Sequence, residues 1–299
     1  MSLQTSFLCI SLLLPCVQVQ AAINVFTCEP EWAALAKELG GDQLDIYSAT
    51  TALQDPHHIQ ARPSLIAKAR KADLLICAGA ELETGWLPLL MRKAGNARIR
   101  AGQAGHFLAA EHIDMLEVPE KLDRSLGDVH ASGNPHVHTD PRNISRIAGQ
   151  LYKRLVGIDP DNTDIYSKRY SIFEREWQDA INVWNNQAAA VNGVNVVVHH
   201  DYWSYLIDWL GLVKVATLEP VPGVAPSTGH LSQIKQLLNT QPATMIIDTS
   251  YMNDRPVQWL SKQTGIPVVA LPATVDYQGG ESLYDWFKHI VDLITGQVE

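Results

Sequence analysis

Basic runs are missing from this sequence of 299 residues, which has 23 Lys and Arg against 32 Asp and Glu and a formal net charge of −9. A nucleic-acid-binding protein usually presents clustered cations that neutralise phosphates, so this composition argues against that class. The hydrophobic share of 46% is ordinary for a globular protein. The chain is long enough to form two lobes with separate cores.

Long hydrophobic runs are also scarce. An uncharged, largely apolar stretch of eleven residues at 7–17 is too short to span a bilayer. It is followed by Val19-Gln20-Ala21, a small-x-small pattern typical of signal peptidase cleavage, so we predict that residues 1–21 are a signal peptide and that the protein is exported. No Lys or Arg precedes the run, which departs from the usual pattern. The alternative is a lipoprotein box at Leu13-Leu14-Pro15-Cys16, which the proline disfavours.

Cysteine is limited to four residues, and two of them lie in the predicted signal peptide. The other two, Cys28 and Cys77, each end a predicted strand. Neighbouring parallel strands could bring them within disulfide distance, and export permits oxidation, but two buried free thiols fit equally well. Their number and spacing exclude a zinc finger built from four cysteines or from paired cysteines and histidines.

Short apolar, β-rich runs alternate with helical patterns in both halves of the chain, three times within residues 23–95 and four times within residues 194–297. Asp140 and Pro141 mark the start of a helix that extends to about Ile158. We predict an α/β fold in which two similar lobes with parallel sheets enclose a cleft. The predicted divisions are an N-terminal lobe at 22–160, a linking helix at 161–191 and a C-terminal lobe at 192–299.

Seven of the eleven histidines form three clusters, which are His57-His58, His130 with His136 and His138, and His199-His200. Each cluster follows a predicted strand or precedes a helix, where open α/β sheets bind ligands. Asp276 ends the last predicted strand at the corresponding edge of the second lobe. Two histidines of the first lobe could therefore meet one histidine and one carboxylate of the second. Such a set suits tetrahedral Zn²⁺, whereas Mn²⁺ favours more oxygen.

Each of these residues also has a simpler interpretation. A histidine at a strand end often makes only hydrogen bonds, His199 could be buried packing, and His138 could support the site or be solvated. Asp140 and Asp285 compete with Asp276 for the carboxylate position, although Asp140 has an obvious role as a helix cap. The loop at 219–231 could support the site through Glu219 or His230, but a turn leading into a helix explains it more simply.

These motifs resemble those of the substrate-binding proteins of bacterial ABC importers for zinc and manganese, over nearly the whole mature chain. By this resemblance DPHHIQARPS implies His57 rather than His58 as the first ligand, NPHVHTDPRN implies His136 and HHDYWSYLIDWLGL implies His200. Manganese members tend to carry glutamate at the third position, so histidine favours zinc. The family's last aspartate commonly lies in a Leu-Asp-Pro segment. Here the strand ends in LPATVD, so Asp276 is assigned by position alone.

The resemblance implies a receptor, not an enzyme, that captures Zn²⁺ between its lobes and delivers it to an ABC permease in the inner membrane. We expect a periplasmic monomer, with a lipid-anchored form as the alternative and other periplasmic metal-binding proteins as further partners. One alternative function is a manganese or iron receptor. Another is a zinc hydrolase with an open coordination position, but the sequence lacks an HExxH motif and an obvious general base. Because metal binding needs neutral imidazoles, affinity should fall as pH drops through the histidine range.

Overall fold

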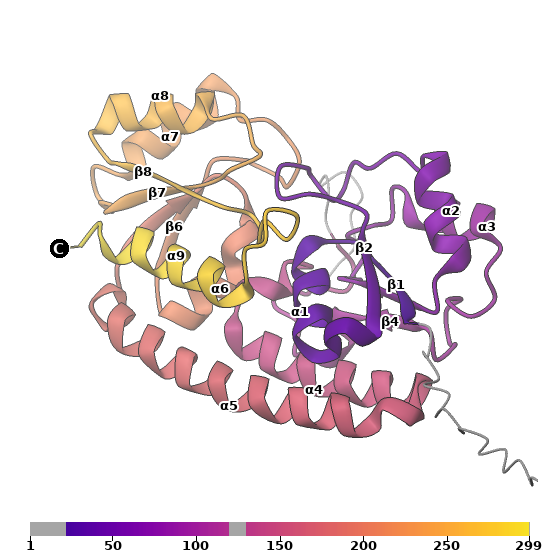
Figure 1. Cartoon of the computed structure of the whole chain (residues 1–299). Helices are drawn as coiled ribbons and strands as arrows, with labels where there is room; N and C mark the ends of the chain where they lie inside the picture. The colour runs from indigo at the N-terminus through magenta and orange to yellow at the C-terminus, as the bar shows by residue number, and fades with distance from the viewer. Residues whose placement is uncertain (1–21, 120–129, 299) are drawn as a thin grey trace, which may run out of the picture.

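The computed structural model describes residues 22–119 and 130–298 and contains two four-stranded parallel sheets (Figure 1). The first sheet has the order β2-β1-β3-β4 and the second has the order β6-β5-β7-β8, so the two lobes share one strand arrangement. The prediction of two similar α/β lobes is confirmed. The predicted signal peptide lies outside the described residues. The strands are β1 (Ile23–Thr27), β2 (Leu44–Ser48), β3 (Leu74–Cys77), β4 (His106–Leu108), β5 (Asn195–Val198), β6 (Val213–Thr217), β7 (Met245–Thr249) and β8 (Val268–Leu271).

Proline occupies the first turn of five helices, where its missing N–H costs no hydrogen bond. Asp140 caps α4 by accepting a hydrogen bond from Arg142 N at 2.7 Å. No helix in the described part of the chain is both long and apolar enough to cross a membrane. The helices are α1 (Pro30–Gly40), α2 (Pro63–Lys71), α3 (Leu87–Ala94), α4 (Pro141–Ile158), α5 (Thr163–Gln187), α6 (Ser204–Leu210), α7 (Thr228–Leu237), α8 (Arg255–Thr264) and α9 (Leu283–Thr295).

Helix α5 runs beneath both lobes (Figure 1). Its 25 residues span about 37 Å at about 1.5 Å per residue. Near its N-terminus Arg169 Nε donates to the carbonyl of Glu38 at 2.8 Å, and at its C-terminus Gln187 Nε2 donates to Asp292 Oδ1 at 2.7 Å. The helix is shorter than the predicted 161–191, because 3-10 turns flank it on both sides. It therefore braces the N-terminal lobe against the C-terminal lobe.

One hydrophobic cluster joins the two lobes. It includes Leu35 of α1, Ile144 of α4, Trp177 of α5 and Phe287 of α9, all fully buried. The Trp177 and Phe287 rings meet edge to face with centroids 5.4 Å apart. Separate clusters fill the outer layers beneath α2 and α3 and beneath α7 and α8. Because both lobes share a close-packed core with α5, the fold resists wide rotation of one lobe against the other.

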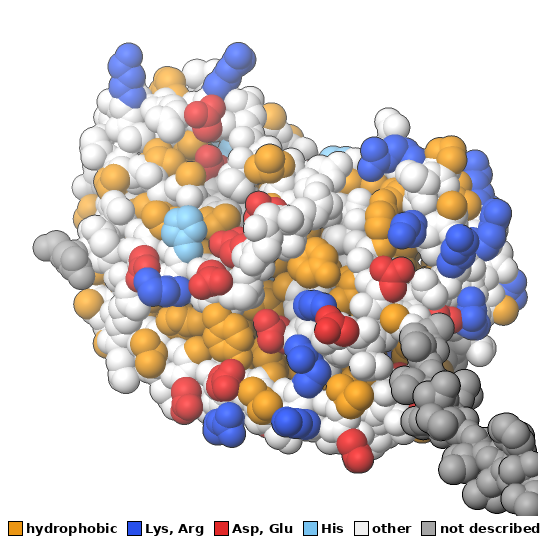
Figure 2. Space-filling model, in the orientation of Figure 1, with side chains coloured by type: hydrophobic (Ala, Val, Ile, Leu, Met, Phe, Trp, Pro, Cys, Tyr) orange, Lys and Arg blue, Asp and Glu red, His pale blue; other side chains and the backbone are white. Residues whose placement is uncertain are grey.

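Basic side chains gather on the outer helices α2 and α3 of the first lobe, at the right of Figure 2. Among them the structure shows one ion pair, Arg98 with Asp73 at 2.7 Å. The negative net charge is therefore carried by the rest of the chain. Folding creates a basic face that a sequence without basic runs does not reveal. Its exposed members are Arg62, Lys68, Arg70, Lys71, Arg92, Lys93, Arg98 and Arg100.

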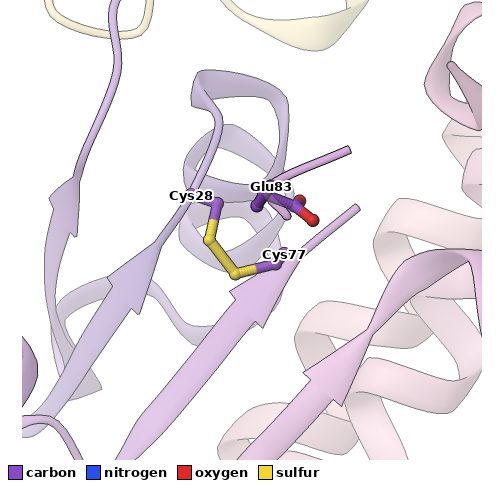
Figure 3. Close-up of side chains that lie close together, drawn as sticks. All are labelled: Cys28, Cys77 and Glu83. Atoms are coloured by element: carbon purple, nitrogen blue, oxygen red, sulfur yellow. A yellow bond between two sulfur atoms is a disulfide. The ribbon is translucent and has the colours of Figure 1, made fainter. Parts of the chain in front are cut away.

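Cys28 and Cys77 form a disulfide between the ends of β1 and β3, beside Glu83 (Figure 3). The two strands pair in parallel with Thr27 opposite Ile76, so the following residues face each other with Cα atoms 4.8 Å apart. Of the two alternatives left open by the sequence, the structure has the disulfide. In the described residues, these two sulfurs and Glu83 are the one group of three potential metal-donor atoms within 4.8 Å of one another. The disulfide leaves no thiolate to bind a metal.

Glu83, beside the disulfide, and Glu29, next to Cys28 in the chain, are two buried residues, each about 3% exposed. Glu83 Oε1 accepts a hydrogen bond from Ala78 N at 2.7 Å, and Glu29 Oε2 accepts a weaker one from the same N–H at 3.2 Å. Burial raises the pKa of Glu83 from 4.5 to about 7. Burial, together with repulsion from Glu83 and Glu31, raises the pKa of Glu29 well above its ordinary value. The pair therefore favours a protonated state near neutral pH.

We predict that Glu83→Gln removes a loss of stability at high pH. Folding raises the pKa of Glu83. The contribution of this residue to the unfolding free energy is therefore fully present below pH 4.5 and is lost as pH rises through about 7. Relative to wild type, the variant should gain on the order of 2 kcal/mol of unfolding free energy between pH 5 and pH 8. Urea unfolding at both values measures this. Glu111→Gln, at an exposed carboxylate, is the control. If the unfolding free energy changed by the same amount between pH 5 and pH 8 in the variant and in wild type, the prediction would be wrong.

Candidate metal centre

Four imidazole rings converge where the two lobes meet. His57 follows β2, His136 directly precedes a 3-10 turn at the start of α4, and His200 follows β5. His130 completes the group. Ring centroids are 5.4 Å apart for His57 and His130, 5.7 Å for His57 and His136, 5.8 Å for His136 and His200 and 6.5 Å for His57 and His200. Two imidazoles bound to one tetrahedral zinc would have centroids about 5.2 Å apart. The structure thus brings together the three histidines predicted as ligands.

The donor nitrogens are not yet at chelating distance. No three of these histidines, among the residues described, have ring nitrogens that all lie within 4.8 Å of one another. The centroid distances exceed the value for a zinc site by about 0.2 to 1.3 Å. Binding a metal therefore requires small rotations and shifts of rings that already lie together. It does not require distant segments to be brought together.

Asp55 orients the ring of His57. The Asp55 carboxylate accepts hydrogen bonds from His57 N at 2.9 Å and from His57 Nδ1 at 2.8 Å. Burial alone would raise the pKa of Asp55, but the hydrogen bonds and charge of His57 hold it below its ordinary value, so the carboxylate stays ionised. Since Nδ1 carries the proton, the lone pair lies on Nε2. A carboxylate behind a metal-binding histidine commonly fixes the ring in this way.

Glu219 does the same for His200. His200 Nδ1 lies 2.7 Å from Glu219 Oε2, and that oxygen also accepts a hydrogen bond from Gly223 N at 2.9 Å. The side chains of His200 and Glu219 are 12% and 7% exposed. The proline- and glycine-rich loop therefore folds around a carboxylate that orients His200. From the sequence a simple turn is the preferred interpretation of this loop, whereas in the structure Glu219 contacts His200.

His136 is the most buried of the four imidazoles, at 1% exposure. Neither of its ring nitrogens has a hydrogen-bond partner in the described structure. Burial lowers its pKa well below the ordinary value, and the neighbouring imidazoles lower it further, so the ring is neutral. Asn134 Oδ1 accepts from His136 N at 3.0 Å, and Tyr202 stacks on the ring with centroids 3.9 Å apart. A buried imidazole with two unpartnered nitrogens is costly unless a ligand satisfies it.

The other clustered histidines have different environments. His58 is 73% exposed on the outside of its loop. His199 is buried, and its Nδ1 lies 2.7 Å from Asp248 Oδ1. His138 is also buried, with Nδ1 3.3 Å from Glu31 Oε1 and Nε2 3.2 Å from the carbonyl of Ala273. In each cluster, therefore, a structural or solvated histidine stands beside one that faces the converging rings.

Asp276 is not brought to the three histidines. It is exposed, and its Oδ1 accepts a hydrogen bond from Gly279 N at 3.0 Å in a turn. No contact shown for His57, His136 or His200 involves it. Strand β8 ends at Leu271, so four residues without regular structure separate it from this aspartate. The two competing aspartates cap helices, Asp140 at α4 and Asp285 within the capping box of α9.

A cavity of about 200 Å³ reaches the converging rings. His130, His136 and His200 line it together with Glu117 and Asp201. Both carboxylates pair with Lys214, at 3.1 Å for Glu117 and 2.5 Å for Asp201. The cavity is large enough for a hydrated cation. Its anionic groups are already neutralised in part, so the donors it offers are mainly imidazoles.

Two α/β lobes braced by one long helix, with imidazoles gathered between the lobes, define a substrate-binding protein for a metal ion. The family of the zinc-uptake complex component A, periplasmic (ZnuA), matches residues 25–296, and the chain belongs to this family. It is 25% identical over 277 residues to the manganese ABC transporter substrate-binding lipoprotein PsaA of Streptococcus mitis, covering 88% of this chain and 85% of that protein. The metal ABC transporter substrate-binding lipoprotein SsaB of Streptococcus sanguinis is 24% identical over 281 residues, with the same coverage.

Solved structures share the fold. A crystal structure of ZnuA superposes with a TM-score of 0.76 at 22% identity and covers 93% of this chain and 100% of that chain. A periplasmic metal binding protein from Candidatus Liberibacter asiaticus gives 0.75 at 16% identity and covers 92% and 99%. The chain is thus an exported substrate-binding protein of a metal ABC importer, which works with a membrane permease. The expectation that it is not an enzyme is confirmed by its family, and the hydrolase alternative is wrong.

Proposed function

We propose that this chain is a zinc receptor, which captures Zn²⁺ through Nε2 of His57, Nε2 of His200 and a ring nitrogen of His136 and delivers it to its permease. The observation that supports this most is the state of the three rings. Two are oriented by carboxylates that leave Nε2 as the donor. The third is buried and neutral, and it has no hydrogen-bond partner among the described residues. Metal binding needs the imidazole in its neutral form, and burial favours that form at His136.

Zinc is favoured over manganese by the type of donor. The converging groups offer nitrogen, whereas Mn²⁺ prefers carboxylates, carbonyls and water. The carboxylates closest to the rings, Asp55 and Glu219, are occupied by the Nδ1 atoms of His57 and His200. The family is named for zinc uptake, while the streptococcal relatives are named for manganese or metal. We therefore base the choice of zinc on the donors of this chain.

For the location, we propose a soluble periplasmic monomer released from the signal peptide at 1–21, in preference to a lipid-anchored form. We also retain the proposed division into lobes at 22–160 and 192–299 with a linking segment at 161–191. Helix α5 makes hydrogen bonds to the N-terminal lobe near one end and to the C-terminal lobe at the other, and it packs in the core that both share. This supports its role as a segment that links two lobes. Mass spectrometry of the exported protein would show whether a diacylglycerol remains attached.

Metal titration of residues 22–299 tests the zinc proposal. We expect one Zn²⁺ per chain, bound tightly enough to compete with a chelating dye. Because most nitrogen and oxygen sites prefer Zn²⁺ to Mn²⁺, competition alone is not decisive. The sharper measurement is Mn²⁺ alone, which we expect not to bind stoichiometrically at tens of micromolar. Stoichiometric Mn²⁺ binding in that range, or no zinc binding at all, would contradict the proposal.

Asp55→Asn and Glu219→Gln should each weaken zinc binding by about 10–100-fold, because each replaces a carboxylate that fixes a ligand ring and increases its basicity. The measurement is the same zinc titration. Asp248→Asn is a matched control, since Asp248 makes the same 2.7 Å contact to a histidine, His199, that is not a proposed ligand. We expect the control to keep wild-type affinity. Equal losses in all three variants would mean that the effect is a general one on the fold.

A further inference from the structure

The ring of His130 lies against that of His57, with its Nε2 3.3 Å from Nε2 of His57. We propose that His130 is the fourth ligand and that zinc is held by four imidazoles, with no carboxylate in direct contact. This proposal rests on the proposed zinc function and adds the ligand that the geometry places where the sequence suggested Asp276. His130 also lines the cavity that reaches His136 and His200.

The distance between the two nitrogens fits a shared metal. Two nitrogens bound to one tetrahedral zinc at about 2.0–2.1 Å lie about 3.3–3.4 Å apart. The separation of 3.3 Å between His57 and His130 matches this value, and their ring centroids, 5.4 Å apart, are the closest of the four measured pairs. The Nδ1 proton of His57, held by Asp55, leaves the Nε2 lone pair directed at the point that the two rings would share.

The backbone around His130 is held in place. Ala131 N donates to the carboxylate of Glu81, and Gly133 N donates to the carbonyl of His130 at 3.2 Å. Glu81 has a φ of +69°, which non-glycine residues rarely adopt, and Gly133 has a φ of +102°. A Cβ on Gly133 would lie 2.6 Å from the carbonyl oxygen of Leu116, so only glycine fits there. A strained residue and a required glycine therefore both help to hold His130 against His57.

Charge balance also favours four neutral ligands. Zn²⁺ brings two positive charges, and the carboxylates of Asp55 and Glu219 behind the rings bring two negative charges. The metal, its four imidazoles and these two carboxylates would together be neutral, which suits a largely buried position. A directly bound Asp276 would add a third negative charge. Four nitrogen donors would also discriminate against Mn²⁺ more strongly than three nitrogens and one carboxylate.

A simple N–H···N hydrogen bond between His57 and His130 would also give a short contact, so the test has to count ligands. We expect His130→Ala to lower zinc affinity by at least about tenfold. Zinc K-edge X-ray absorption should report four imidazoles in wild type and three in the variant. Millimolar free imidazole should restore the fourth ligand and part of the affinity, which loss of a structural hydrogen bond would not allow. His130→Gln provides a second variant, and circular dichroism without zinc checks the folding of both.

The outcomes separate this inference from the proposed function. If wild type holds zinc and the His130 variants keep its affinity and imidazole count, the four-imidazole site is overturned while the zinc receptor stands. The same conclusion follows if Asp276→Asn, measured in parallel, removes an oxygen ligand. If wild type holds no zinc, the proposed function fails together with the inference. Loss of one imidazole in His130→Ala, with Asp276→Asn unchanged, is the supporting result.

Discussion

His136→Ala should abolish tight zinc binding, with a loss of more than about 100-fold, because loss of a direct ligand should exceed the 10–100-fold typical of outer partners. His136 is the fully buried ring around which the others gather, with centroids of His57 and His200 at 5.7 and 5.8 Å. Competitive titration with a chelating dye measures the loss.

Folding should survive this change, because within residues 22–119 and 130–298 the ring nitrogens of His136 have no hydrogen-bond partner to lose. His136→Leu keeps most of the side-chain volume and separates the loss of a ligand from the creation of a void. His58→Ala is the matched control, since His58 belongs to the same kind of cluster but is 73% exposed. If His136→Leu kept wild-type affinity, or if His58→Ala lost it, the assignment of ligands would be wrong.

The sequence predicted three of the converging rings because regular strands and helices place the residues next to their ends. His199 and His200 are the first two residues after β5, and their side chains diverge. His199 reaches Asp248 of β7, and His200 faces the site. The same rule assigned Asp276, but in this structure its carboxylate does not lie beside the three histidines. Strand β8 ends at Leu271, and an irregular stretch then turns the aspartate toward Gly279.

Long-range contacts explain what the sequence could not predict. The position of His130 depends on its neighbour Ala131, whose N–H donates to Glu81, fifty residues earlier in the chain. The disulfide depends on strand order, because β1 lies between β2 and β3 and so pairs with both. Alternating runs indicate which strands exist, but they do not indicate which strands are neighbours.

The shared core has a consequence for how zinc would leave. Both lobes pack on α5, so wide hinge opening would expose a continuous hydrophobic cluster. The groups that orient the rings lie in loops, Asp55 after β2 and Glu219 after β6. Movement of these loops would withdraw the carboxylates and weaken the histidines at little cost to the core. We therefore expect release to depend on loop movement or on contact with the permease.

Reduction of the Cys28–Cys77 disulfide should cost the folded protein about 3–4 kcal/mol. The bond links residues 49 positions apart, and closing a loop of that length limits the freedom of the unfolded chain. Cys28 and Cys77 are fully buried within one hydrophobic cluster. We expect this cluster to keep the lobe folded when the bond is reduced. The effect should therefore fall on stability more than on structure.

Urea unfolding followed by tryptophan fluorescence, with and without a strong reductant, measures this effect, and thiol titration shows that the bond was reduced. Cys28→Ala with Cys77→Ala should unfold near the midpoint of reduced wild type and should not respond to reductant. Zinc affinity at low urea should stay close to wild type, because neither sulfur contacts a proposed ligand. Reduced wild type that unfolds at the same urea concentration as the oxidised protein would show that the disulfide does not stabilise this lobe. The loop of His57 is linked to the end of β1, because Thr50 Oγ1 donates a hydrogen bond to the carbonyl of Cys28 at 2.9 Å. A parallel loss of zinc affinity would therefore show that the disulfide positions this loop.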